Sequence, residues 1–314
     1  MRLSVVVVNW NSREDLEACL ASLERQTHRD LEVIVVDNGS VDGSAERVRA
    51  RFGDVKLIET GANLGFAEAC NRGIDASGGE WVAMLNNDAV ADERWAEALA
   101  QAAARCPADC GMLQSLMLFM HDPDVVNSTG IELLRTGRGN DRLEGARRGE
   151  IAAEEVEVFC PTAGAAAYRR AMLDEIRIGE GYFDRSHFMY LEDLDLGWRA
   201  RLAGWSARLV PGSVVRHKYQ ASTKRRGRPW LLVTSRTNRA RTLAKNASPS
   251  LWLHSLHFTL WDVAVVAWNG GPRAVIGYAD ALRKGLHQRG EVERIRRRPR
   301  RDTEARWAKP RRSR

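Results

Sequence analysis

The chain contains 314 residues, 44% of them hydrophobic and 28% charged, which is enough to bury one large core or two moderate ones. Its formal net charge of +7 comes from the C-terminus, where residues 283–314 hold 14 Lys or Arg and four carboxylates, whereas residues 1–282 are net acidic. A basic nucleic-acid-binding face is therefore excluded outside this Arg-rich tail. Five cysteines without a CxxC pair predict neither a disulfide framework nor a zinc site.

The N-terminus enters a strand-like run at once, without the apolar region or cleavage site of a signal peptide. No stretch approaches the roughly 18 apolar residues that a membrane-spanning helix requires. The sequence therefore predicts a cytoplasmic protein without a transmembrane segment.

Four apolar runs in the first third of the chain are typical of buried β-strands. They cover residues 3–8, 31–36, 55–59 and 82–85. Helical patterns separate them, and the first such pattern is marked by Leu16, Leu20 and Leu23. Because strand and helix alternate with short connections, we expect an α/β fold with a mostly parallel sheet flanked by helices.

Polar side chains follow these strands, at the edge where open α/β sheets bind their ligands. Asn9 follows the first strand and Asp37 the second, where a carboxylate can accept hydrogen bonds from a nucleoside. The fourth strand runs into Asn86, Asn87 and Asp88, whose oxygens suit a hard cation, although a polar turn is the alternative. Since no glycine-rich phosphate loop occurs, a cation on Asp88 would have to neutralise a diphosphate.

A second polar cluster follows in the C-terminal half. Glu192 and Asp193 begin a predicted helix, where the macrodipole stabilises carboxylates, so this pair is either structural or a source of a general base. His217 follows a later strand-like run, and a lone histidine is usually structural, although imidazole with a carboxylate suits Mg²⁺ or Mn²⁺.

Two segments between these clusters differ in composition. Residues 159–170 are mostly small, including Thr162 and Gly164, so either a ligand approaches the backbone closely or the segment packs tightly on the sheet. Residues 135–155 are polar and are predicted to form a mobile loop near the ligand.

Several ordered motifs resemble those of family 2 glycosyltransferases with the GT-A fold, closest to the rhamnosyltransferase-like branch. They are SVVVVNWN at residues 4–11, VDNGSVDGS at 36–44, NLGFA at 63–67 with Asn71, and LNND at 85–88. The resemblance covers residues 3–245.

The resemblance implies a nucleotide-sugar donor, a glycan or lipid-linked acceptor, and a divalent cation, Mg²⁺ or Mn²⁺. It implies that Asp88 and His217 hold the cation, with Asn86 and Asn87 standing where the family has acids. It also implies that Asp193 is the catalytic base and that Glu192 orients it or the acceptor. The implied donor site comprises Asn9, Asp37, Asn38, Ser40, Asp42, Asn63, Gly65, Phe66, Asn71, Asn86 and Asn87. The implied acceptor site comprises Thr162, Gly164 and Trp198.

The C-terminal region is predicted to lie outside the catalytic domain. Residues 246–289 form a helical extension with a break at 269–271, after which Pro272 begins the next helix. Its tryptophans and arginines fit peripheral contact with the inner face of the cell membrane, and packing on the domain or on a second subunit is the alternative. Residues 290–314 have little apolar content and are predicted to be a disordered basic tail.

We therefore expect a GT-A catalytic domain at residues 1–245, with a nucleotide-binding half at 1–110 and an acceptor-binding half at 111–245. The predicted function is an inverting, metal-dependent transfer of L-rhamnose from dTDP-rhamnose to a glycan or lipid-linked acceptor of the cell envelope. A UDP-sugar-dependent galactofuranosyl or glucosyl transferase is the alternative within the family. The alternatives outside it are a nucleic-acid-binding protein that uses the Arg-rich tail and a nucleotide-sugar-binding scaffold without activity.

Overall fold

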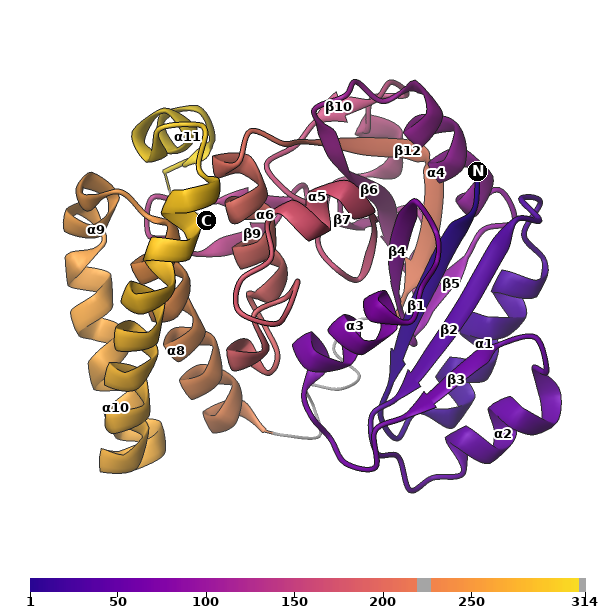
Figure 1. The fold of residues 1–314 in the computed structure, drawn as a ribbon, viewed down its shortest axis with the longest axis horizontal. Coiled ribbons are helices and arrows are strands. Elements are labelled where there is room, and N and C mark those ends of the chain that lie inside the picture. The colour runs from indigo at the N-terminus through magenta and orange to yellow at the C-terminus, as the bar shows by residue number, and fades with distance from the viewer. Residues whose placement is uncertain (219–226, 311–314) are drawn as a thin grey trace.

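The computed structural model describes residues 1–218 and 227–310 (Figure 1). Within these residues a ten-stranded mixed sheet forms the centre, with β5 and β7 attached to β12 and β6 beside the path β10-β12-β6-β11-β4-β1-β2-β3. Its strands are β1 (Leu3–Asn9), β2 (Leu31–Asp37), β3 (Lys56–Glu59), β4 (Trp81–Asn86), β5 (Ala89–Ala91), β6 (Cys110–Phe119), β7 (Val126–Ser128), β10 (Val156–Glu157), β11 (Ala165–Arg169) and β12 (Ser206–His217). β1 pairs in parallel with β2 and β4, β2 with β3, and β12 with β6, whereas β11 runs antiparallel to both neighbours.

Helices cover both faces of this sheet, because successive side chains of a strand point to opposite faces. Val5 and Val7 of β1 pack in the cluster formed with α1 (Arg13–Glu24), α2 (Ser44–Arg51) and α4 (Trp95–Arg105). Val6 lies in the cluster formed with α3 (Phe66–Asp75), α5 (Arg170–Glu175) and α6 (Glu192–Leu202). The predicted α/β fold with a mostly parallel sheet flanked by helices is confirmed.

Residues 135–155 were predicted to be a mobile loop near the ligand, but part of this segment is regular secondary structure. The segment contains β9 (Gly139–Asp141), which pairs antiparallel with β8 (Ile131–Leu133), and the short 3-10 helix η1 (Arg148–Glu150). Arg138 at the start of the hairpin donates a hydrogen bond to the buried carboxylate of Asp262, 124 residues later. A charged side chain of this segment thus has its partner far away in the sequence, and the composition of the segment alone does not reveal such a pair.

The C-terminal helices pack on the side of the molecule that carries α6, away from β3 and α2 (Figure 1). They are α8 (Arg228–Asn246), α9 (Pro249–His254), α10 (Leu256–Ile295) and α11 (Arg300–Trp307). α10 lies along α8 and bends at Gly271, whose φ of 68° and ψ of −169° are not helical, so the predicted break before Pro272 is confirmed. Among the described helices, none combines the length and apolar content needed to cross a bilayer.

The prediction of a disordered tail is wrong for residues 290–310. α10 continues to Ile295, and α11 carries the buried residues Arg300, Thr303 and Glu304. Ion pairs and one aromatic ring replace the missing apolar content: Arg306 pairs with Glu157, and Trp307 lies 6.0 Å from Phe159. The rest of the predicted tail, residues 311–314, lies outside the described residues.

Candidate active site

A cavity of about 480 Å³ lies at the carboxyl ends of β1, β2 and β4. The β8–β9 hairpin, the loop before α6 and the start of α8 complete its wall. The predicted site residues that line it are Asn38, Asn63, Phe66, Asn86, Asn87, Asp88, Thr162, Gly164, Glu192, Asp193 and His217. The structure therefore brings residues from both halves of the predicted catalytic domain into one cavity.

The floor of the cavity is a hydrogen-bonded layer beneath its surface. The Asn9 amide donates to one carboxylate oxygen of Asp37 at 3.2 Å, and the backbone N–H of Ser40 donates to the other at 2.9 Å. Asn9 in turn accepts a 2.7 Å hydrogen bond from Asn87. Asn9, Asp37 and Ser40 do not line the cavity in this structure, and their first role is to hold the loops after β1, β2 and β4 together.

Asn38 and Asn63 do face the cavity and are fixed by each other. The Asn38 amide donates to Oδ1 of Asn63 at 3.3 Å and to the carbonyl of Gly65 at 3.2 Å. Gly65 has a φ of +89°, and a Cβ there would lie 2.7 Å from the carbonyl oxygen of Phe188. Gly65 thus permits a close contact between the two halves and does not offer a side chain to a ligand.

Three further predicted binding residues do not line the cavity in this structure. Asp42 accepts hydrogen bonds from the backbone N–H groups of Arg13 and Ser44 and so joins two helix starts. Asn71 is buried in α3, with its amide groups bonded to the backbone of residues 182–183. Trp198 is fully buried in the core and does not line the cavity, because α6 is enclosed on all sides after its first turn.

Asp88 and His217 meet at the end of the cavity where β4 and β12 finish. Oδ1 of Asp88 lies 3.0 Å from Nε2 of His217, and both side chains are nearly buried. Nδ1 of His217 lies 2.8 Å from Oδ1 of Asn127, which places a proton on Nδ1. The lone pair of Nε2 then lies beside the Asp88 carboxylate, and two such donor groups side by side can bind one cation.

These two ligands fit a divalent cation that is completed by substrate oxygens. No group of three His, Cys, Asp or Glu side chains within residues 1–218 and 227–310 forms a metal cage. A carboxylate and an imidazole with diphosphate oxygens are, however, a donor set that Mg²⁺ and Mn²⁺ accept in phosphate-binding sites. Asn86 contributes an amide contact here, since its Nδ2 lies 3.2 Å from Nε2 of His217, whereas the Asn87 amide bonds to Asn9.

The opposite wall carries the acidic pair Glu192 and Asp193 at the N-terminus of α6. Asp193 accepts hydrogen bonds from the backbone N–H of Ala163 at 3.2 Å and of Leu194 at 2.8 Å. Burial raises the pKa of Glu192 well above its usual range, and the neighbouring Asp193 raises it further. Burial also raises the pKa of Asp193, although these two backbone N–H groups oppose the shift. We infer that Glu192 keeps a proton and that Asp193 carries the negative charge.

Asp141 is a cavity residue that the sequence did not reveal. It lies on β9, opposite Ile131, and burial raises its pKa to about 6, with Asp193 among the charges that add to the shift. Asp141 stands in the polar segment that was predicted to be a loop, so only its pairing in the hairpin could have identified it. Other lining residues that the sequence analysis missed are Val8, Trp10, Asn140, Met189, Tyr190, Leu231 and Ser235.

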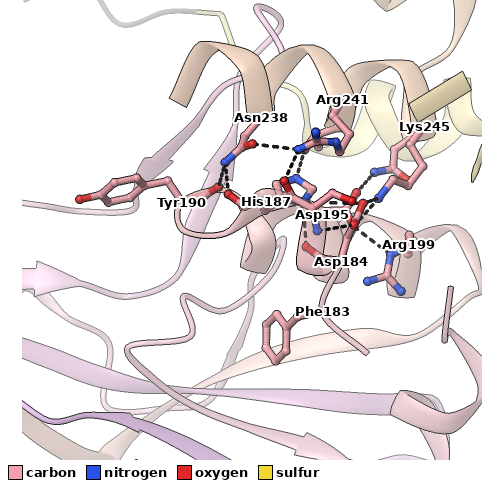
Figure 2. A network of polar contacts seen from close by, with 12 residues as sticks. Phe183, Asp184, His187, Tyr190, Asp195, Arg199, Asn238, Arg241 and Lys245 are labelled. Carbon is pink, nitrogen blue, oxygen red and sulfur yellow. Dashed lines mark hydrogen bonds and ion pairs between the residues drawn. The ribbon is translucent and has the colours of Figure 1, made fainter. Parts of the chain in front are cut away.

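A buried polar network holds the loop that delivers the acidic pair (Figure 2). Phe188, Tyr190 and Leu191 all have positive φ values, between 61° and 74°, a conformation that side-chain-bearing residues rarely adopt. The Asn238 amide of α8 lies 2.8 to 2.9 Å from the carbonyl oxygens of residues 187, 189 and 190. Asn238 therefore fixes the backbone immediately before Glu192.

Charged groups anchor the same loop to α8 farther along that helix (Figure 2). Lys245 of α8 pairs with Asp184 and, at 3.1 Å, with Asp195, which also pairs with Arg199 at 3.0 Å. Burial raises the pKa of Asp184, but Lys245 and His187 outweigh this effect and the net shift is downward. Burial lowers the pKa of His187 to about 4, so this imidazole is neutral near pH 7. The carboxylates of Asp184 and Asp195 are therefore ionised, and each is paired with a buried cation, without which a buried charge would be unstable.

Comparison with known proteins agrees with this arrangement. The family model described as Glycosyl transferase family 2 matches residues 4–177. The chain is 32% identical over 247 residues to the N-acetylglucosaminyl-diphospho-decaprenol L-rhamnosyltransferase of Mycobacterium tuberculosis, covering 71% of this chain and 78% of that protein.

Solved structures share the fold at low sequence identity. The mannosyltransferase PcManGT from Pyrobaculum calidifontis, in complex with GDP-Man and Mn²⁺, superposes with a TM-score of 0.53 at 20% identity over 91% of this chain and 75% of its own. GalNAc-T7 with UDP, GalNAc and Mn²⁺ gives a TM-score of 0.65 at 14% identity over 93% of this chain and 57% of its own. The predicted GT-A fold is confirmed. From its sequence and its fold, the chain belongs to glycosyl transferase family 2 and is a glycosyltransferase.

Proposed function

We propose that the chain is an inverting transferase that moves L-rhamnose from dTDP-rhamnose to a lipid-linked glycan acceptor of the cell envelope. The observation that carries the proposal is one cavity with the Asp88–His217 pair at one end and the carboxyl groups of Glu192 and Asp193 at the other. The rhamnosyltransferase of Mycobacterium tuberculosis, similar over most of both chains, favours this sugar and a diphosphate-linked lipid acceptor.

In the proposed mechanism Asp193 removes the proton from the acceptor hydroxyl as that oxygen bonds to the anomeric carbon of the donor. The bond between the anomeric carbon and the phosphate oxygen breaks with its electron pair, and dTDP leaves from the opposite side, which inverts the configuration. Backbone N–H groups from residues 163 and 194 orient the base, and protonated Glu192 adds no second charge beside it.

Asp88 and His217 are the residues that would hold the divalent cation, Mg²⁺ or Mn²⁺. When bound, the cation would neutralise the charge of the departing diphosphate. Asn86 and Asn87 stand where the resembling family has acids, so this chain would depend on Asp88 for its only carboxylate ligand at that turn.

The donor can be tested by isothermal titration calorimetry with dTDP-rhamnose, UDP-glucose and UDP-galactofuranose, each with Mn²⁺, Mg²⁺ or a chelator. We expect metal-dependent binding of dTDP-rhamnose that is lost in Asp88→Ala and kept in Asp54→Ala, an exposed carboxylate outside the cavity. Binding of a UDP-sugar alone would support the alternative donor. Metal-independent binding with no turnover would instead support a scaffold without activity.

The structure of the C-terminal tail weakens the alternative of a nucleic-acid-binding protein. Four of the tail's described arginines form ion pairs within the chain: Arg296 and Arg300 pair with Glu293, Arg297 with Glu175, and Arg306 with Glu157. Part of the positive charge that prompted this alternative is therefore used in contacts within the chain.

A further inference from the structure

The outer face of α9 and the first half of α10 is apolar and exposed. We define the outer face as Leu253, Leu256, Leu260, Trp261 and Trp268, which are exposed by 75%, 47%, 65%, 63% and 91%. Single exposed apolar residues are ordinary on protein surfaces, but these five follow one another along one pair of helices. Trp268 in particular is almost entirely in contact with solvent in the isolated chain.

The first half of α10 carries its one carboxylate on the buried side. Between residues 249 and 272 the sequence contains one ionisable carboxylate, Asp262, and no Lys or Arg. Asp262 is fully buried and pairs with Arg138 at 2.9 Å, Arg239 at 2.8 Å and Arg236 at 3.3 Å. A helix at a water-exposed surface normally has the opposite arrangement, with apolar residues inside and charged residues outside. The outer face is thus apolar although it is exposed, while the one carboxylate of this stretch lies on the buried side with Val266.

Basic residues continue the surface beyond the bend at Gly271. Arg273, Arg283 and Lys284 are exposed, and Asp280 is the one carboxylate near them. Both halves of α10 turn their buried residues toward α8, among them Val266 and Tyr278, so the opposite sides of both halves face outward. The outward surface of α10 therefore combines exposed indole and leucine side chains with an excess of positive charge.

We propose that the outer face docks on a lipid bilayer with anionic headgroups. Indole rings and leucines enter the interfacial region of a bilayer, and nearby Lys and Arg attract anionic lipids. The absence of any exposed carboxylate between residues 249 and 279 complements such a surface. The helices would lie on the membrane, with their apolar side chains inserted, and would not span it.

The outer face lies close to the active-site cavity, with α8 between them. Leu231 and Ser235 of α8 line the cavity, whereas Val233 and Ala240 of the same helix pack against α10. One helix layer, about 8–10 Å between axes, thus separates the active-site cavity from the docking surface. This placement suits an acceptor whose lipid part stays in the bilayer. The lipid-linked acceptor rests on the proposed function, whereas the docking surface does not.

The test is flotation of the full-length chain with vesicles of phosphatidylcholine alone or with phosphatidylglycerol added. We expect binding to the anionic vesicles and at least about a tenfold loss in a Trp261→Ser/Trp268→Ser variant, because two indoles no longer insert. Val41→Ser removes another apolar side chain, which is 90% exposed but lies outside the C-terminal helices. This control variant should bind the vesicles as the unmodified protein does. Arg273→Glu should reduce the preference for anionic vesicles.

Other outcomes would overturn the docking proposal. Absence of vesicle binding, or equal binding by the double tryptophan variant, would do so. Sedimentation velocity showing a dimer that this variant abolishes, without vesicle binding, would assign the face to a second copy of the chain. Turnover on a water-soluble acceptor should be unchanged in the variant. Vesicle binding without turnover of dTDP-rhamnose would leave the docking surface intact and contradict the proposed function alone.

Discussion

The two walls of the cavity are built by different means. The floor after β1, β2 and β4 consists of hydrogen bonds among loops that follow neighbouring parallel strands, as in Asn9 with Asp37. The opposite wall depends on a strained loop, a hairpin and α8, and its contacts join residues far apart in sequence, such as Asn238 with Tyr190. The floor thus follows from the topology of the sheet, whereas the acidic wall needs support from the C-terminal helices.

The largest effect should follow from removing the charge of the acidic wall. Asp193→Asn keeps the shape of the side chain but cannot accept the acceptor proton, so kcat should fall by about 10²- to 10⁴-fold. Donor affinity, measured by calorimetry, should stay the same because the floor is untouched. Asp54→Asn, an exposed carboxylate, is the matched control. Retained turnover in Asp193→Asn would move the base to another residue, with Asp141 as the first to examine.

The next largest effect concerns Lys245, which anchors the loop before α6 through Asp184 and Asp195. Lys245→Met leaves Asp184 and Asp195 buried without their cation and should lower the free energy of unfolding by about 3–5 kcal/mol. Lys284→Met, which breaks only an exposed pair with Asp280, should change it by less than about 1 kcal/mol. Urea denaturation measures both.

The same anchor has a pH signature whose sign follows from its carboxylates. The pKa of Asp184 is lower in the folded chain than in the unfolded chain, so its contribution is complete above the unfolded value of about 3.9 and is lost as the pH falls below it. The difference between the unmodified chain and Lys245→Met should therefore shrink in acid. An equal difference at pH 3 and pH 7 would contradict this account.

A smaller effect is expected from Asn238, which positions the loop before Glu192 but does not take part in the proton transfer. Asn238→Ala removes the donor to three carbonyl oxygens and lets the loop before Glu192 relax, so kcat should fall on the order of tenfold to a hundredfold. Donor affinity should not change, because the floor is independent of α8. Asn269→Ala, which loses a hydrogen bond to Val265 on α10, is the control and should keep kcat. A loss of donor affinity in Asn238→Ala would mean that the two walls are coupled.

The same contrast explains what could be predicted from the sequence. Asn86, Asn87 and Asp88 were found because a buried strand ends there, and the end of a parallel strand points to a ligand. Asn71 and Trp198 lie outside the cavity, because a motif position does not show whether a side chain faces the core. Asp141 was missed because its place depends on a hairpin stabilised by Arg138 and Asp262, a pair that no local pattern contains.

Asp141 provides a prediction about pH and stability. Its pKa is raised to about 6, so between about pH 4 and pH 6 the folded chain binds more protons than the unfolded chain and stability falls as the pH rises. Asp141→Asn cannot ionise and should be more stable than the unmodified chain at pH 7 by about 1–2 kcal/mol, after allowance for its partial exposure. At pH 4 the two should be equal, and Asp124→Asn, an exposed carboxylate, should show no such trend.

The smallest effect is expected where a long-range contact lies at the surface. Arg306 pairs with Glu157, 149 residues earlier, but its side chain is 55% exposed, so water and salt screen the attraction. Arg306→Ala should therefore lower the free energy of unfolding by less than about 1 kcal/mol, and high salt should remove the difference. Trp307→Ala, next to it, should cost more, because that ring packs on Phe159 and beneath the guanidinium of Arg201. If Arg306→Ala were the more costly of the two, charge and not aromatic packing would hold the tail, and the C-terminal half would depend on ion pairs at its surface as well as in its core.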